Sequence, residues 1–183
     1  MAYRNSNYTA FYVSDYFSTS NLGAYATRDF CYYQTLRSWK GQDASFPFID
    51  AHEKTYNVRD SSNWECTLKP RLHERLSMSQ NIILILSDYT RPSRALNEEI
   101  IYGIDTLGLP VIVAYAELGY VGSGSHITYD AEHLWKNLPE FRLRISDVPT
   151  AHIPFKKECF KRALTDPRFS VVIKTNNCMV AFD

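Results

Sequence analysis

The chain has 183 residues, of which 45% are hydrophobic and 22% charged, a composition typical of one globular domain and not of a disordered chain. Its 20 basic side chains balance 20 acidic ones, so the basic excess typical of proteins that bind nucleic acids or acidic membranes is missing. No apolar run approaches the ~20 residues that cross a bilayer, and the polar start lacks the core of a secretory signal. We therefore expect a cytoplasmic protein with no nucleic-acid and no membrane partner.

The cysteines and histidines do not have the spacing of a metal or redox site. None of the four cysteines belongs to a Cys-x-x-Cys pair, and the five histidines form neither His-Glu-x-x-His nor another paired spacing. Widely separated cysteines of this kind behave as small hydrophobic residues in a reducing compartment. We expect no bound metal and no redox cofactor.

In chain order, the first third of the sequence predicts a strand, a helix and a second strand. Residues 9–14 (TAFYVS) form a short β-prone run. The apolar spacing over 24–40 predicts a helix. Residues 45–49 (SFPFI) predict a short strand, and Pro47 favours a sheet edge because proline cannot donate a ladder hydrogen bond.

The middle third predicts two buried strands, each preceded by a helix. Leucines recur every four residues between 68 and 76, which indicates an amphipathic helix. The aliphatic run in 81–87 (NIILILS) requires cover on both faces, as in a central parallel strand. A helix over 93–107 leads to another buried strand, 111–115 (VIVAY). Alternation of this kind over 9–116 predicts a doubly wound parallel sheet with helices on both faces.

The last third has weaker patterns. Residues 130–137 and 154–164 predict short helices, and the glycine-rich stretch 119–125 is typical of an ordinary surface loop. The ending SVVIKTNNCMVAF is compatible with a hairpin that turns at Asn176 and Asn177.

Polar side chains follow the carboxyl ends of the predicted strands, where ligands of open parallel sheets bind. They are Ser14, Asp15 and Tyr16, then Asp50 and His52, then Ser87, Asp88 and Thr90, and finally Glu117. Neither GxGxxG nor GxxxxGK[ST] occurs, so the phosphate loops of dinucleotide dehydrogenases and P-loop enzymes are missing. This acidic, hydroxyl-bearing rim suits a ligand with sugar hydroxyls better than one held by its phosphates alone.

Glu99 has an unusual place in the helix predicted for 93–107. On a helical wheel the apolar residues gather on one side, Glu98 points away from them into solvent, and Glu99 lies on the flank. Gly103, one turn on, would leave room beside the Glu99 carboxylate. The wheel leaves a second interpretation open, in which Glu99 is an ordinary boundary glutamate that reaches water or pairs with Arg94.

The segment LSMSQNIILILSDYTRPSRALNEEIIYGIDTLGLPVIVAY resembles the centre of TIR-like domains. It contains a strand that ends in Ser, a short turn, a Ser-started helix with a Glu-hydrophobic pair in its second turn, and a Gly-x-Pro strand. TAFYVSDYF is similar to the family's first strand, and PFIDAHEKT to its second strand and the loop after it. The similarity is greatest to the bacterial TIR-like proteins of the Thoeris anti-phage systems. It implies a flavodoxin-like fold with residues 1–183 as one TIR-like domain, a core over about 9–116 and a C-terminal elaboration over 117–183.

The resemblance implies an NAD-cleaving enzyme, an NAD glycohydrolase or ADP-ribosyl cyclase, with Glu99 as its catalytic residue. Catalytic TIR domains carry their essential glutamate just before an aliphatic residue, and Glu99-Ile100 occupies that place whereas Glu98 does not. Ala95-Leu96 departs from the family, which often has an aromatic residue followed by Val or Cys there. The other implied NAD contacts are Ser14, Asp15 and Tyr16 against the nicotinamide riboside, and Asp50 and Ser87 against ribose or phosphate.

NAD is a substrate in this interpretation, and no cofactor is needed. Its nicotinamide is already a cation and can leave without a general acid, so the site must stabilise an oxocarbenium-like ribose. Water as acceptor gives ADP-ribose, whereas an internal hydroxyl or adenine nitrogen gives a cyclic form. The resemblance implies that infection activates the enzyme, that the nucleotide turns on a separate effector protein, and that a homo-oligomer completes the site.

Three other interpretations fit parts of the sequence. A TIR module without activity would bind only other TIR surfaces, and fold alone does not exclude it. A nucleoside deoxyribosyltransferase also cleaves an N-glycosidic bond with a glutamate on a similar sheet, and nucleosides tested against NAD would separate the two. A receiver domain that uses Asp88 as phosphoacceptor would need an acidic pair after the first strand and a lysine after a later strand, and neither is evident.

Overall fold

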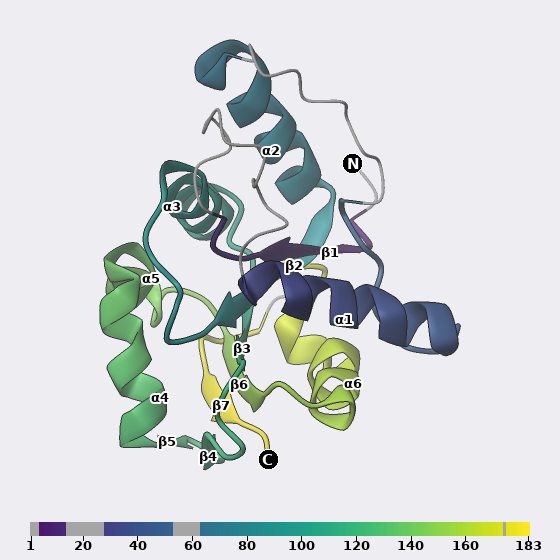
Figure 1. The fold of residues 1–183 in the computed structure, drawn as a ribbon, viewed down its shortest axis with the longest axis vertical. Helices are drawn as coiled ribbons and strands as arrows, with labels where there is room; N and C mark the ends of the chain where they lie inside the picture. Colours follow the sequence, from purple (N-terminus) through teal and green to yellow (C-terminus); the bar gives the residue numbers. More distant parts are fainter. Residues whose placement is uncertain (1–3, 14–27, 53–62, 174) are drawn as a thin grey trace.

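A computed structural model of the chain describes residues 4–13, 28–52, 63–173 and 175–183. Its centre is a five-stranded sheet in the order β1-β2-β3-β6-β7, in which every neighbouring pair is parallel (Figure 1). The strands are β1 (Ser6–Ala10), β2 (Ser79–Leu86), β3 (Val111–Tyr115), β6 (Thr150–Pro154) and β7 (Met179–Ala181). A separate antiparallel pair is formed by β4 (Gly122–Ser123) and β5 (His126–Ile127).

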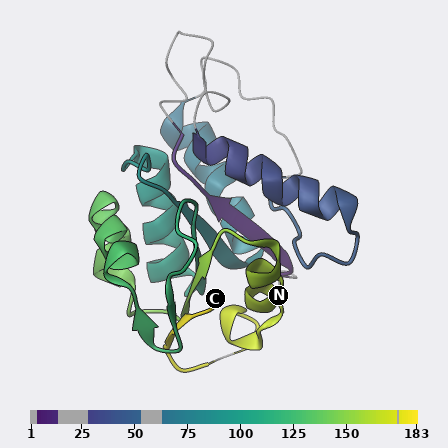
Figure 2. The ribbon, with the colours of Figure 1, turned by 60° about the horizontal axis from the view of Figure 1, so that its bottom comes forward.

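Helices cover both faces of the sheet, as the alternation of elements predicts (Figures 1 and 2). One face packs against α2 (Lys69–Ser77), α3 (Arg94–Ile101), α4 (Tyr129–Leu134) and α5 (Pro139–Arg144), and the other against α1 (Arg28–Gln42) and α6 (Lys157–Thr165). Turns of π-helix precede α2 (Trp64–Leu68) and extend α3 (Tyr102–Thr106), and short 3₁₀ turns follow α4 (Trp135–Asn137) and α6 (Pro167–Phe169). None of the helices in the described ranges is long and apolar enough to cross a membrane.

The central strand β2 explains why its sequence is aliphatic without alternation. Ile82, Leu84 and Leu86 pack on the side of α2 to α5, whereas Ile83 and Ile85 pack on the side of α1 and α6. Every one of these side chains is at most 1% exposed. A strand between two helical layers has no solvent face, so both sets of side chains are apolar.

The strand expected at 45–49 is wrong. Residues 44–46 form a turn and a bend, and the chain meets β1 only at the end of this segment, through Ile49 and a single bridge between Asn7 and Asp50. The Asn7 side chain accepts the N–H of Ile49 through Oδ1 (2.8 Å) and donates to Asn81 Oδ1 (2.9 Å). Hydrogen bonds of the Asn7 side chain therefore replace some of the backbone hydrogen bonds of a regular β-ladder at this edge.

The first strand also differs from its expected limits, because β1 begins at Ser6 beside Ser79 and ends at Ala10. Residues 14–27, which include the start of the helix expected at 24–40, lie outside the described residues. The end of that helix, at Gln42, is close to the expected one.

The C-terminal third corrects three further expectations. The ending does not form a hairpin in the described residues, because β7 pairs in parallel with β6 as the fifth strand. The start expected for the helix at 154–164 is the last residue of strand β6, and the helix begins at Lys157. Helix α5 was not anticipated at all.

Candidate active site

Glu99 lies in the second turn of α3 and faces β1. Ser93 starts this helix by accepting the N–H of Leu96 through its side chain (3.2 Å), and the buried residues Leu96 and Ile100 hold the helix on the sheet. On the flank between them, Glu99 Oε1 accepts a hydrogen bond from the hydroxyl of Tyr8 (2.7 Å). Tyr8 is itself a buried residue of β1, so strand and helix together fix the partly buried carboxyl group.

The surroundings of Glu99 favour its neutral form. Burial raises the pKa of Glu99 to about 8, against the opposing effects of the Tyr8 hydrogen bond and the positive charge of Arg75. A carboxyl group with such a pKa is largely protonated at neutral pH. It responds strongly to a cation, because a positive charge nearby stabilises the ionised form.

The neighbouring glutamate has the opposite environment. Glu98 Oε1 lies 2.7 Å from His73 Nε2 and 3.2 Å from Lys69 Nζ, so it pairs with α2 and does not point freely into solvent as the wheel suggested. Burial works against ionisation, but the hydrogen bonds from His73 and Lys69 lower the pKa of Glu98 below its ordinary value. The pKa values of the two adjacent carboxyl groups are thus shifted in opposite directions, because the two groups face different neighbours.

Arg94 does not pair with Glu99. Its Nη2 donates to Glu65 Oε1 (2.6 Å), and its guanidinium lies 4.7 Å from the centroid of the Trp64 ring. The interpretation in which Glu99 pairs with Arg94 is therefore wrong.

Gly103 does not leave room beside Glu99 either. A Cβ atom at this buried position would collide with the Cδ1 methyl group of Ile82 and contact Leu76 at 3.6 Å. The missing side chain allows close packing of the helix on β2 and α2. The expected cavity at Gly103 is thus filled by aliphatic side chains.

His52 extends the site beyond the residues predicted as NAD contacts. Its ring centroid lies 4.6 Å from that of Tyr8, and its Nε2 lies 3.0 Å from the carbonyl oxygen of Thr9. Since a carbonyl can only accept, Nε2 carries the proton, and Nδ1 accepts from Nη1 of Arg75 (3.4 Å). Burial, with help from Arg75, lowers the pKa of His52 to about 4, against the effect of Asp50, so the ring is neutral at physiological pH.

Asp50, a predicted ribose or phosphate contact, is engaged by protein groups. Its Oδ2 accepts from the Tyr33 hydroxyl (2.6 Å) and lies 3.7 Å from Arg37 Nε, while Oδ1 accepts the N–H of His52 (2.9 Å). Burial and the Asp50 carboxylate raise the pKa of Tyr33, which keeps this phenol a donor. Asp50 thus holds the backbone at His52, and a direct contact between Asp50 and NAD stays a prediction.

Ser87 lies at the end of β2, as expected, but its hydroxyl is buried and donates to Asp29 Oδ1 (2.8 Å). Thr90 Oγ1 donates to the other carboxyl oxygen of Asp29 (3.0 Å). Burial raises the pKa of Asp29, while these two hydrogen bonds act in the opposite direction. Asp29 thereby joins α1 to the turn that precedes α3, a role that its place in a predicted helix did not reveal.

Ser14, Asp15 and Tyr16, the residues expected against the nicotinamide riboside, lie outside the described residues. Of the other predicted site residues, Glu99 and Asp50 belong to one connected group through Tyr8 and His52, whereas Ser87 belongs to the Asp29 group. Tyr8 and Arg75 were not predicted as site residues, because a tyrosine in a strand and an arginine in a helix carry no motif. His52 was expected on the polar rim at the strand ends, with no NAD contact assigned to it. Within the described ranges, no group of three His, Cys, Asp or Glu side chains could hold a metal ion.

A comparison with protein families agrees with the fold. The family model described as Thoeris protein ThsB, TIR-like domain, matches residues 8–118. The match runs from β1 through β3, covers more than half of the 183 residues, and includes Tyr8, His52 and Glu99. The chain belongs to the TIR-like domain family of the Thoeris protein ThsB.

Proposed function

We propose that this protein cleaves the bond between nicotinamide and ribose in NAD, with Glu99 as the catalytic residue. The observation that carries the proposal is the partly buried Glu99 carboxyl group, held by the Tyr8 hydroxyl at 2.7 Å. Family membership adds support, because TIR-like domains are often NAD-cleaving. Glu99-Ile100 also resembles the pattern in which catalytic TIR domains carry their essential glutamate.

The raised pKa of Glu99 suits this chemistry. With a pKa of about 8, Glu99 is mostly neutral in the empty site. The nicotinamide cation of NAD would lower that pKa on binding, so the substrate itself would ionise the group. The carboxylate would then lie in surroundings of low polarity, where it stabilises developing positive charge far better than in water.

The bond changes follow from the substrate. The bond between ribose C1′ and the nicotinamide nitrogen breaks, and its electron pair neutralises the nicotinamide ring. The positive charge that remains on the ribose is stabilised by Glu99 until an acceptor attacks C1′. Water yields ADP-ribose and a proton, whereas an internal hydroxyl or adenine nitrogen yields a cyclic nucleotide.

The Thoeris family supports a role in anti-phage defence. We propose that the NAD-derived nucleotide acts as a signal for a separate effector protein and that assembly of several copies completes the site. Infection would then be the trigger, so the resting protein would have little activity.

The test measures nucleotides in cells that express the wild type, Glu99→Gln or Glu98→Gln, with and without phage challenge. Glu98→Gln is the matched control because it removes the adjacent carboxylate, which pairs with Lys69 and His73. We expect NAD to fall, or a new ADP-ribose species to appear, in challenged cells with wild type and Glu98→Gln only. If all three extracts match under challenge while the proteins are folded and abundant, the enzyme proposal fails and the non-catalytic TIR module becomes the better explanation.

A further inference from the structure

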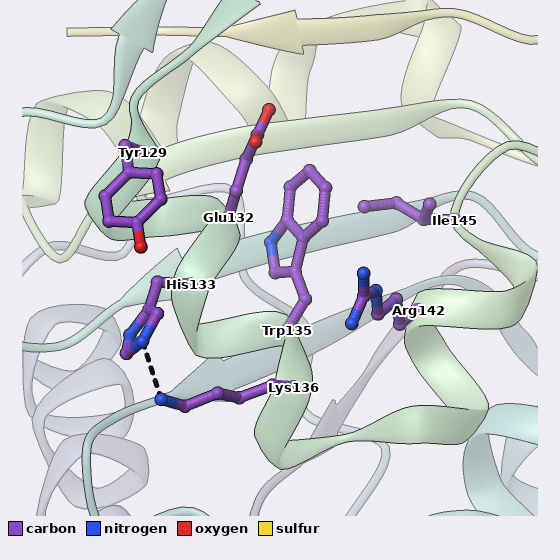
Figure 3. Close-up of a pocket in the computed structure, with 7 residues that line it drawn as sticks. All are labelled: Tyr129, Glu132, His133, Trp135, Lys136, Arg142 and Ile145. Atoms are coloured by element: carbon purple, nitrogen blue, oxygen red, sulfur yellow. Dashed lines mark hydrogen bonds between the residues drawn. The ribbon is translucent and has the colours of Figure 1, made fainter.

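A pocket of about 420 Å³ lies on α4 and α5, beyond the residues that the family model matches. Its volume falls in the range of small-molecule sites. The lining residues are Tyr129, Glu132, His133, Trp135, Lys136, Arg142 and Ile145 (Figure 3). None of them belongs to the group around Glu99.

Trp135 is held in place from beneath by buried polar groups. Its Nε1 donates to the hydroxyl oxygen of Tyr115 (2.7 Å), and the Tyr115 hydroxyl lies 2.8 Å from His152 Nδ1. Burial lowers the pKa of His152 to about 3, so its Nδ1 can accept from Tyr115 while Nε2 lies 3.3 Å from Thr150 Oγ1. The indole ring is thus fixed before any ligand arrives, which reduces the entropy lost on stacking.

The remaining wall combines cations with an exposed aromatic ring. Lys136 Nζ lies 2.6 Å from His133 Nε2, and Arg142 is exposed beside Trp135 (Figure 3). Among the residues that the structure describes, neither Lys136 nor Arg142 has an acidic side chain within ion-pair distance. Tyr129 is 77% exposed.

Among the described residues that line the pocket, Glu132 is the only acidic one, and its carboxylate points away from Lys136 (Figure 3). Lys136 and Arg142 therefore leave the pocket with a net positive charge at neutral pH. Lys and Arg groups of this kind bind phosphate.

We infer that this pocket binds a free nucleoside phosphate, with the base stacked on the rings of Tyr129 and Trp135 and the phosphates held by Lys136 and Arg142. Two aromatic rings beside cations that have no acidic partner match the two halves of such a ligand, since bases stack on aromatic side chains and phosphates pair with cations. The site is separate from Glu99 and does not depend on the proposed NAD cleavage.

The test titrates ADP, inorganic phosphate and adenosine into the full chain and follows binding by calorimetry. Lys136→Gln combined with Arg142→Gln should weaken ADP binding about tenfold or more, since hydrogen bonds to charged groups are lost. Tyr129→Ala should weaken it about fivefold, because an exposed ring contributes stacking and little to folding. Lys161→Gln is the matched control, because it removes a cation on α6, outside the pocket. Lys161 pairs with Asp43, and Asp43 keeps a second partner in Lys157 at 3.3 Å when Lys161 is replaced.

The inference stands if ADP binds more tightly than phosphate or adenosine, and if Lys161→Gln and Glu99→Gln leave that affinity unchanged. It is overturned if ADP does not bind, or if the double variant binds ADP like the wild type. Equal affinity for phosphate and ADP would also overturn it, because the site would then recognise charge alone. Loss of ADP binding in Glu99→Gln, with the double variant unaffected, would assign the ligand to the Glu99 site instead.

Discussion

Replacing Glu99 by Gln should make the protein more stable at high pH, although it removes the group proposed to act on NAD. The folded state holds the Glu99 proton up to a pKa of about 8, compared with an ordinary value of 4.5. Between these values the folded state binds more protons than the unfolded chain, so the free energy of unfolding falls as pH rises. The contribution is fully present below pH 4.5 and is lost once the pH passes 8.

The size of the effect follows from the difference between the Glu99 pKa in the folded state and its ordinary value. A pKa difference of one is worth about 1.4 kcal/mol, which sets an upper limit of roughly 5 kcal/mol for ionising Glu99 in the folded state. The side chain is only partly buried, and solvent screening reduces the effect to an expected 2–4 kcal/mol, roughly half of that limit or more. Gln keeps the shape and still accepts the Tyr8 hydrogen bond, but it has no charge to bury.

The assay is urea unfolding of the wild type, Glu99→Gln and Glu98→Gln at pH 5, 7 and 9. The stability advantage of Glu99→Gln should grow with pH. Glu98→Gln should instead be less stable than the wild type by about 1 kcal/mol at all three pH values. The reason is that it removes the carboxylate that interacts with His73 and Lys69, the groups that lower the Glu98 pKa. A flat difference for Glu99→Gln, or the same trend for both variants, would refute the reasoning.

Three further predictions concern the neighbours of Glu99 and the packing of α3. Tyr8→Phe removes a hydrogen bond that lowers the Glu99 pKa, so the pH at which kcat/KM for NAD rises should become higher. The free energy of unfolding should fall by about 1 kcal/mol, because one hydrogen bond is lost. An unchanged pH profile in an active Tyr8→Phe enzyme would contradict this. Gly103→Ala should destabilise by about 1–3 kcal/mol in thermal unfolding because its Cβ would meet Ile82. Ile82→Val removes that methyl group, so the double variant should lose less than the sum of the two single losses. Asp29→Ala leaves the buried hydroxyls of Ser87 and Thr90 without their acceptor, so calorimetry should show that the free energy of unfolding falls by about 2–4 kcal/mol. A fall below about 1 kcal/mol, the size expected for a surface substitution, would mean that the Asp29 group does not hold α1 in place.

The sequence by itself determined the layered α/β architecture. The aliphatic run of β2 and the strand Val111–Tyr115 are buried on both faces in all-parallel pairs, as their composition indicates. Periodicity also put Glu99 on the flank of its helix, where the structure places it against Tyr8 of β1. These inferences succeed because hydrophobic patterning and local spacing act over a few residues along the chain.

Only the tertiary structure decided what surrounds Glu99. The Tyr8 hydroxyl is 91 positions away in sequence, and the neutral state of His52 depends on its burial and on Arg75. The same holds for the C-terminal strand β7, whose parallel partner β6 is far from it along the chain. Burial, hydrogen bonds and pKa values arise from segments that meet after folding, and no local pattern records which segments those are.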